Sequence, residues 1–231
     1  MKNPEIHLDI LKLTVKELAP INDEIVYLGG STISLYITEP QHIKIRETFD
    51  VDCIVEVAHR EEYETFSKKL RNLGFSEEID SQVTCRFKKG ELILDAMPTD
   101  EKILGFSNPW YKEGFKKSIK YDLDGTQINI FDLPYLIATK IEAFNGRGKG
   151  QYSYSHDIED IVTLIDGRHD FTEVLATADP KIKQYLIEEF TNLANEKRFI
   201  DSLDAHISDR VNIKGRKEIV LERINAFLKS N

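Results

Sequence analysis

The uneven distribution of glycine and proline along this chain constrains its fold strongly. Residues 168–231 contain one glycine, Gly215, and one proline, Pro180. Pro180 follows Asp179 and suits the first turn of a helix. Connections between strands need glycine or proline at short intervals, whereas helix interiors exclude both, so this segment is expected to be helical.

The first 131 residues differ, because short β-branched and apolar runs alternate there with turns. Strands are predicted at 25–28 and 50–57, hairpins at 83–96 and 119–130, and helices at 5–18, 32–38 and 61–73. We therefore expect an α/β (α+β) protein in which residues 1–131 form a mixed β-sheet with flanking helices. Residues 132–231 are expected to form a C-terminal helical bundle.

Composition excludes several classes of protein. The net charge of −9 argues against a surface built wholesale for coating nucleic acid. No apolar run reaches the roughly 18 residues of a membrane span, and Glu5 and Asp9 interrupt the region where a signal peptide would be apolar. A cytoplasmic protein without membrane contact is expected. Cys53 and Cys85 lie in apolar stretches without metal-ligand spacing, which predicts two buried thiols.

Asp50 and Asp52 are the most informative acidic residues. They begin an apolar, β-branched run, and residues two apart on a strand point to the same face. Two such carboxylates repel each other unless a metal ion, a basic partner or solvent stabilises them. Mg²⁺ is commonly held by carboxylates together with phosphate oxygens. The alternative is that both are ordinary solvated residues at a strand end.

Two other segments strengthen the metal-site interpretation. Gly29, Gly30 and Ser31 join a predicted strand to a predicted helix, where backbone N–H groups and a helix N-terminus could approach phosphate. Ser31 is the expected helix cap. Asp95 ends a further apolar strand and could offer a third carboxylate to the same site. Ordinary turn chemistry at the glycines is the alternative.

These motifs together resemble a known superfamily. Leu28-Gly29-Gly30-Ser31, followed by Arg46-x-Thr48-x-Asp50-Val51-Asp52 and by Asp95, is similar to the nucleotidyltransferases of the DNA polymerase β type. The likeness is greatest to the AbiEii/AbiGii toxin-type members. The resemblance implies that the glycine-serine turn holds nucleotide phosphates. It also implies that Asp50, Asp52 and Asp95 bind two Mg²⁺ ions.

The resemblance extends to residues 133–161 and adds two candidate site residues. The segment from Leu133 to Phe144 resembles the family's lysine-bearing helix, so Lys140 is a candidate phosphate ligand, with a solvated helix lysine as the alternative. Asp157 matches a family acid, although His156 stands where the family usually has arginine or lysine. The gap between Gly30 and Asp50 is also longer than usual. Residues 145–150 are interpreted as a mobile basic loop over the site or as an inert linker.

The function implied is transfer of a nucleoside monophosphate from a nucleoside triphosphate (NTP) to an acceptor hydroxyl, on RNA, a protein or a small molecule. The resemblance also implies a toxin of a toxin–antitoxin or abortive-infection system, with a cognate antitoxin as partner. Basic runs at 112–120 and 210–231 and the aromatic Trp110 could contact RNA, or could be a solvated face and a packing residue. The alternatives are an inactive nucleotide-binding protein on this scaffold and a DxD glycosyltransferase.

Overall fold

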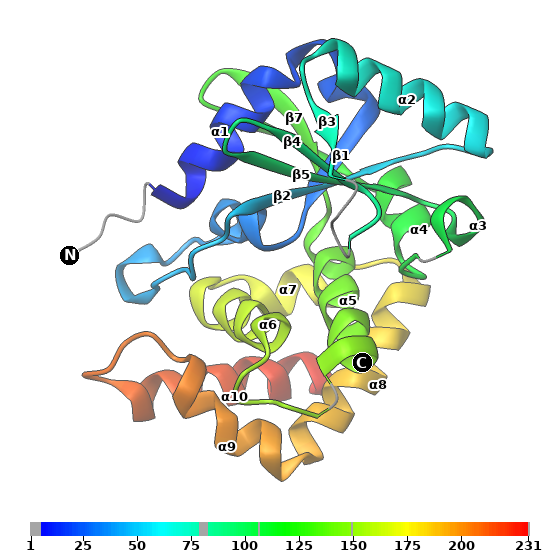
Figure 1. Ribbon diagram of the computed structural model, residues 1–231. Coiled ribbons are helices and arrows are strands. Elements are labelled where there is room, and N and C mark those ends of the chain that lie inside the picture. The colour runs from blue at the N-terminus through cyan, green and yellow to red at the C-terminus, as the bar shows by residue number, and fades with distance from the viewer. Residues whose placement is uncertain (1–5, 79–82, 106, 149, 231) are drawn as a thin grey trace. The chain divides into compact units, whose positions relative to one another are not determined.

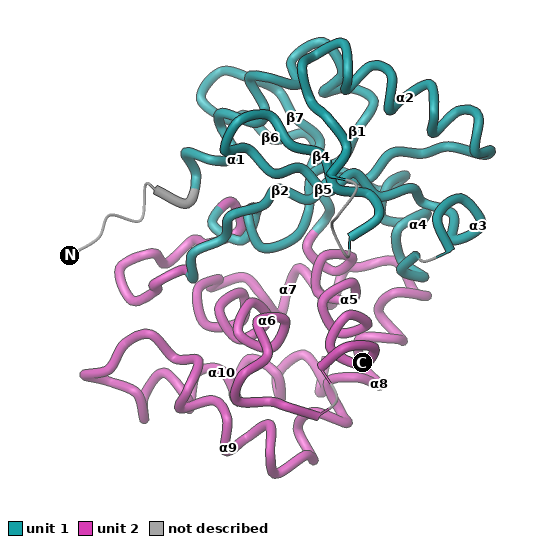
Figure 2. The backbone as a smooth tube through the Cα atoms, viewed as in Figure 1, with its two compact units in different colours: residues 1–34, 46–132 teal, residues 35–45, 133–231 magenta. Residues whose placement is uncertain are grey.

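The computed structural model describes residues 6–78, 83–105, 107–148 and 150–230 (Figure 1). The chain divides into two compact units (Figure 2). Unit 1 consists of residues 1–34 and 46–132, and unit 2 consists of residues 35–45 and 133–231.

Unit 1 is built on a mixed sheet, which has seven strands within the described residues, in the order β3-β4-β5-β2-β1-β7-β6 (Figure 1). The strands are β1 (Ile25–Leu28), β2 (Asp50–Val55), β3 (Ser76–Glu77), β4 (Arg86–Lys89), β5 (Leu92–Pro98), β6 (Ile119–Leu123) and β7 (Thr126–Ile130). β2 pairs parallel to β5 and antiparallel to β1, and β1 pairs parallel to β7. The predicted mixed sheet is thus confirmed.

Both predicted hairpins are present, and their turns explain them. β6 and β7 are antiparallel, and Asp124 and Gly125 between them have φ values of 53° and 87°. Two successive left-handed residues are what a two-residue hairpin turn requires, and an Asp-Gly pair tolerates them. β4 and β5 are also antiparallel, with Gly90 at φ 59° in their turn.

Unit 1 also contains helices. They are α1 (Ile6–Glu17), α2 (Arg60–Asn72), α3 (Glu101–Leu104) and α4 (Tyr111–Lys116), with a 3₁₀ helix, η1 (Ala19–Glu24), after α1. In α2, Tyr63, Phe66 and Leu70 are buried, while its other face carries charged side chains. Each fully buried large apolar side chain contributes roughly 1.5–3 kcal/mol to stability. Trp110 is buried at the start of α4, which identifies it as a packing residue.

The segment after the Gly29–Gly30 turn differs from the prediction. Instead of a helix over 32–38 capped by Ser31, residues Gly30–Tyr36 form a 3₁₀ helix, η2. Ser31 therefore lies inside the helix and does not cap it. Thr32 makes the local hydrogen bond, with its Oγ1 donating to the Gly29 carbonyl at 3.0 Å. Turns of this tighter helix are usual in short connectors.

Unit 2 is helical, and the predicted C-terminal bundle is confirmed. Its helices are α5 (Leu133–Ala143), α6 (His156–Gly167), α7 (Phe171–Ala176), α8 (Pro180–Asn195), α9 (Lys197–His206) and α10 (Ile213–Lys229), with a π-helical turn, η4 (Phe144–Gly148), after α5. Phe190 meets Phe171 and Phe227 edge-on, with ring centroids 6.0 and 5.9 Å apart. These three rings join α7, α8 and α10 in one core.

Residues 35–45 belong to unit 2 although they lie early in the chain. Within them is a short 3₁₀ helix, η3 (Pro40–His42). The backbone N–H groups of Thr38 and Glu39 both donate to the carbonyl of Gly167, at 2.9 Å each. The Glu39 carboxylate also accepts a hydrogen bond from Arg223 at 2.6 Å. These long-range contacts hold the segment on the helical unit. No helix within the described ranges is long and apolar enough to span a membrane.

Candidate nucleotide and metal site

The sheet brings the three acids of the sequence motif together on one face of unit 1. Asp50 and Asp52 are two residues apart on β2, and both are partly exposed. Asp52 is the register partner of Asp95 in the parallel pairing of β2 with β5. Residues that oppose each other across two strands share a face, and their Cβ atoms are close. The three carboxylates predicted from sequence therefore come from one small area of the sheet.

A basic residue, Arg86, completes this group from the next strand. Arg86 on β4 is the antiparallel register partner of Asp95. Its Nε and Nη2 donate to the two carboxylate oxygens of Asp95, each at 2.7 Å, and Nη2 also donates to Asp50 Oδ2 at 3.0 Å. The forked arrangement on Asp95 is the strong, geometrically specific form of an arginine–carboxylate pair. One guanidinium thus connects two of the three acids.

The sequence interpretation did not single out Arg86, although a signal for it was present. A basic partner was one of the three ways in which Asp50 and Asp52 could be stabilised. The hairpin turn at Gly90 sets a register that pairs position 86 with position 95. Hydrogen bonding to Asp95 raises the pKa of Arg86 above its already high ordinary value, so the guanidinium stays charged. The charge of the cluster is therefore partly neutralised by the protein itself.

The side chain of Asp52 leaves no room for a Cβ at position 29. The Gly29 φ of 80° lies in the left-handed region that favours glycine, and a Cβ at this position would collide with the Asp52 side chain, 2.7 Å from Cγ. Leu28, the residue before it, is the register partner of Asp52 in the pairing of β1 with β2. The glycine turn and the acidic motif are consequently adjacent, as the sequence order predicted.

Two buried hydroxyl groups flank the same turn. Ser31 Oγ and Thr48 Oγ1 are buried, and within the described part of the chain neither has a hydrogen-bond partner. A Cβ on Gly30 would lie 3.0 Å from Thr48 Oγ1 and would collide with the Arg46 guanidinium. Burying an unpaired hydroxyl costs free energy, so such atoms need an explanation. Arg46 and Thr48 belonged to the sequence motif, but no role was assigned to them there.

The donor set suits Mg²⁺ in its chemistry. Asp50, Asp52 and Asp95 are carboxylates, and hard cations such as Mg²⁺ prefer oxygen ligands. Among the residues that the structure describes, however, no group of three or more His, Cys, Asp or Glu side chains is already arranged to hold a metal ion. Arg86 engages two of the carboxylates, and Asp52 lies against Gly29. Metal binding therefore requires at least some of these side chains to change their present contacts.

Lys140 and Asp157, the other two predicted site residues, lie in unit 2. Lys140 on α5 is buried, and its Nζ is 2.6 Å from Asp160 Oδ2 and 3.7 Å from Asp157 Oδ1. Both aspartates are buried near the start of α6, whose N-cap Ser155 accepts a hydrogen bond from the Ile158 N–H. The interpretation of Lys140 as a solvated helix lysine is wrong. Its ammonium group is enclosed with two carboxylates.

Arg147 is a further cation at Asp157. Its Nε and Nη2 donate to the two Asp157 oxygens at 3.0 and 2.9 Å, although 73% of the Arg147 side chain is exposed. Arg147 lies in the π-helical turn Phe144–Gly148, where the sequence predicted a loop. The turn continues α5 and is anchored on α6 by this ion pair. Such π-helical turns occur frequently at functional sites.

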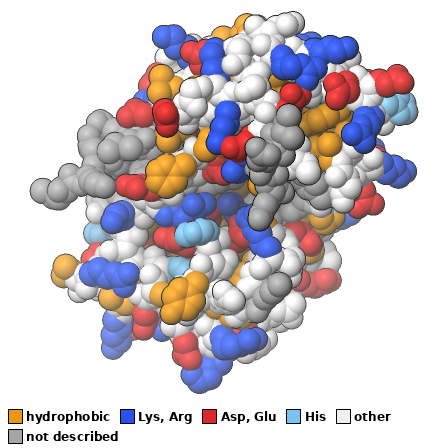
Figure 3. Space-filling view, viewed as in Figure 1, with side chains coloured by type: hydrophobic (Ala, Val, Ile, Leu, Met, Phe, Trp, Pro, Cys, Tyr) orange, Lys and Arg blue, Asp and Glu red, His pale blue; other side chains and the backbone are white. Residues whose placement is uncertain are grey.

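The basic run at 210–231 is largely occupied by internal contacts. Arg216 is buried and bonds Asp166 Oδ1 at 2.7 Å, and burial raises the pKa of Asp166. Lys217 pairs with Asp204 at 2.9 Å. Figure 3 shows basic and acidic side chains interspersed over the face in view. These pairs give much of the run a structural role, so it is not the free basic surface considered from sequence.

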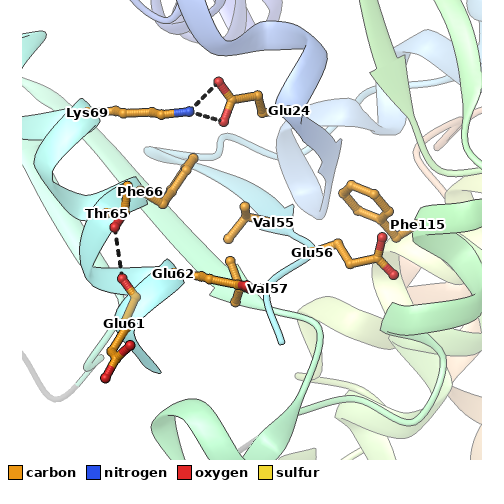
Figure 4. A pocket seen from close by; sticks show the side chains of 10 residues that line it. All are labelled: Glu24, Val55, Glu56, Val57, Glu61, Glu62, Thr65, Phe66, Lys69 and Phe115. Atoms are coloured by element: carbon orange, nitrogen blue, oxygen red, sulfur yellow. Dashed lines mark hydrogen bonds and ion pairs between the residues drawn. The ribbon is translucent and has the colours of Figure 1, made fainter. Parts of the chain in front are cut away.

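A cavity of about 610 Å³ opens elsewhere in unit 1 (Figure 4). Val55, the last residue of β2, lines it together with Val57 and with Phe66 of α2, and so does Glu24, which pairs with Lys69. Asp50 begins β2 and Val55 ends it, a separation of roughly 17 Å along an extended strand. None of the predicted site residues lines this cavity, so it is separate from the candidate site.

Comparisons with known proteins bear on the fold. No protein-family model matches the chain, and no curated protein matches its sequence. A solved structure with a similar fold is the crystal structure of an antigenic nucleotidyltransferase-like protein from Paracoccidioides brasiliensis. The TM-score is 0.52 at 18% identity, and the match covers 87% of this chain and 94% of that chain. At this identity the likeness concerns the fold alone.

Proposed function

We propose that the protein is a Mg²⁺-dependent nucleotidyltransferase that transfers a nucleoside monophosphate from an NTP to an acceptor hydroxyl, with release of pyrophosphate. The observation that carries this proposal is the adjacency of two features in unit 1. Carboxylates of β2 and β5 share one face of the sheet, and Asp52 lies directly against Gly29 of the glycine turn. A nucleotidyltransferase needs this combination because cations and phosphate groups must meet at one point. The nucleotidyltransferase-like fold supports it.

Asp50, Asp52 and Asp95 would hold the metal ions, which when bound neutralise charge on the triphosphate and favour ionisation of the acceptor hydroxyl. Asp95 is the most buried of the three and is the candidate base for that hydroxyl. Gly29 and Gly30 bring backbone close to the phosphates without a side chain in the way.

The buried hydroxyls fit a phosphate group. Ser31 and Thr48 each have an O–H donor, and neither has a partner among the described residues. Phosphate oxygens are strong acceptors, and a guanidinium pairs with them readily. Arg46, next to Gly30, supplies that guanidinium. A nucleotide phosphate bound here would satisfy both hydroxyl groups.

The roles of Lys140 as a phosphate ligand and of Asp157 as a site acid stay predictions from the sequence resemblance. A Lys140 that binds phosphate has to release Asp160 in part. Asp157 orients two cations, Lys140 and Arg147. We also propose the finer assignment to the AbiEii/AbiGii-like toxins, with RNA as the acceptor considered first and a cognate antitoxin as partner.

The second candidate is an inactive nucleotide-binding protein on the same scaffold. The specific observation in its favour is Arg86, which pairs with both Asp50 and Asp95 and offsets one of their negative charges. If this guanidinium never leaves, the protein could bind a nucleotide through the glycine turn without turning it over. Both candidates predict nucleotide binding, and they differ in metal binding and transfer.

The deciding experiment is a labelling assay with the full chain, Mg²⁺, total cellular RNA and each of four α-³²P-labelled NTPs in turn. The wild type should label one RNA size class with one nucleotide, and Asp52→Asn should abolish labelling. Asp23→Asn is the matched control, because Asp23 is an exposed acid of the same unit that pairs with Lys120 at the surface. Equal labelling by wild type and Asp52→Asn would refute the assignment.

The toxin and acceptor assignments have their own tests. Induced expression of the wild type should arrest bacterial growth, while Asp52→Asn should be tolerated at the same protein level. Growth arrest by both variants would contradict a toxin that acts by nucleotidyl transfer. If no RNA is labelled while calorimetry shows Mg²⁺-dependent NTP binding, the search for an acceptor moves to proteins and small molecules.

A further inference from the structure

We propose that Arg86 is a built-in counter-cation of the carboxylate cluster, which Asp50 leaves when a divalent cation binds while Asp95 stays with Arg86. This inference rests on the proposed function, because it concerns the metal-binding acids. Arg86 thereby lowers the affinity of the protein for the metal ion, and Asp50 is the acid that it releases.

The unequal contacts of Arg86 decide which acid leaves. Asp95 accepts two hydrogen bonds from the guanidinium at 2.7 Å, and its side chain is 8% exposed. Asp50 accepts one at 3.0 Å, and its side chain is 37% exposed. A forked ion pair shielded from water is harder to break than a single bond at the surface. Asp50 is therefore the carboxylate that exchanges its partner.

The charge balance explains the effect on metal affinity. With Arg86 present, the cluster of Asp50, Asp52 and Asp95 carries a net charge of two negative units instead of three. A like charge a few ångströms from a cation-binding site weakens binding, most strongly where solvent screening is incomplete. The Arg86 side chain is only 21% exposed, so solvent screens its charge incompletely at the neighbouring carboxylates. Nucleotide-free protein should bind divalent cations weakly for this reason.

The forked ion pair between Arg86 and Asp95 has a second consequence. Because both of its oxygens accept a hydrogen bond from Arg86, the plane of the carboxylate is fixed by β4. Arg86 is thus a positioning residue for Asp95 as well as a competitor for Asp50. A lysine at position 86 would keep the charge and lose the planar fork, which separates the two roles.

The test measures Mn²⁺ binding to the full chain by electron paramagnetic resonance, without nucleotide. Arg86→Gln should bind Mn²⁺ at least about tenfold more tightly than wild type, because the competing charge is gone. Arg86→Lys should lie between the two. Arg71→Gln is the control, since Arg71 is an arginine of the same unit that pairs with Glu64 and Glu77 on α2 and β3. Its affinity should equal that of the wild type.

A thermal melt keeps the test valid if Arg86→Gln folds poorly. The variant should have a lower Tm than wild type in EDTA, and Mn²⁺ should raise its Tm by more than it raises that of the wild type. Equal Mn²⁺ affinity and an equal Tm rise in both proteins would overturn the inference while leaving the transferase proposal standing. If no variant binds Mn²⁺, even with an NTP present, both fail.

Discussion

Gly29 lies directly against the carboxylate of Asp52. The contact joins the end of β1 to the acidic motif of β2, and it leaves no room for a Cβ at position 29. The left-handed backbone of Gly29 adds a second requirement for glycine, so two independent constraints coincide at one residue. The position therefore tests whether the turn and the acid act together.

Gly29→Ala should abolish nucleotidyl transfer and destabilise the protein by more than the conformational cost alone. Gly125→Ala is the matched control, because Gly125 has φ 87° but nothing within 4 Å of a Cβ. The control should lose about 1–2 kcal/mol, the cost of a left-handed alanine. Urea unfolding gives both values, and an equal loss in the two variants would mean that Asp52 moves aside freely.

Thr48→Val should change stability and nucleotide binding in opposite directions. Removing a buried hydroxyl without a partner should stabilise the free protein by about 1 kcal/mol, whereas NTP binding should weaken about five- to tenfold because a phosphate donor is lost. Thr14→Val is the control, since Thr14 is likewise a buried threonine of unit 1 whose hydroxyl has no partner among the described residues. It should stabilise the protein and leave the Kd unchanged. A normal Kd for Thr48→Val would remove Thr48 from the phosphate site.

Lys140→Met should destabilise the protein by about 3–5 kcal/mol, because it leaves Asp160 and Asp157 buried with less positive charge. The double variant Lys140→Met with Asp160→Leu should recover much of that loss in urea unfolding, since both charges of the close pair are then gone. If Lys140 also binds phosphate, the double variant stays inactive in the labelling assay despite its stability. Recovered activity would assign Lys140 to the ion pair alone.

The two cysteines should be unreactive in the native protein. Burial raises the pKa of the Cys85 thiol to about 12 and that of Cys53 well above its usual range. At pH 8 a thiol reagent such as dithionitrobenzoate should label neither residue until the chain is unfolded, when it should label both. Unfolded thiols ionise near pH 8.5 while the folded ones stay protonated, so stability should fall as the pH rises from there toward 12. Rapid labelling of the folded protein would contradict this burial.

A large part of the fold was predictable because local rules decide it. The Asp124–Gly125 pair determines a hairpin turn, and the scarcity of glycine and proline after Arg168 determines helices. The prediction of a helix over residues 32–38 capped by Ser31 was wrong in helix type and in cap. A 3₁₀ and an α-helix of this length share their sequence preferences, and contacts elsewhere in the chain choose between them.

In the candidate site, too, some features follow from local sequence and others from contacts between distant residues. Spacing alone predicted that Asp50 and Asp52 share a face, because side chains alternate along every strand. The sequence order of glycine turn and acids likewise predicted their adjacency. The partners of the acids came from elsewhere, since Arg86 reaches them only after β4, β5 and β2 are paired in register.

The element types, the charged face of β2 and the residue types offered for chemistry follow from local sequence, because periodicity and turn preference act over a few neighbours. Which charges meet depends on the three-dimensional fold: Arg86 pairs with Asp95, Lys140 with Asp160, and Glu39 with Arg223 across most of the chain. Ion pairing depends on distance in space, and strand register and helix packing set that distance regardless of separation in sequence.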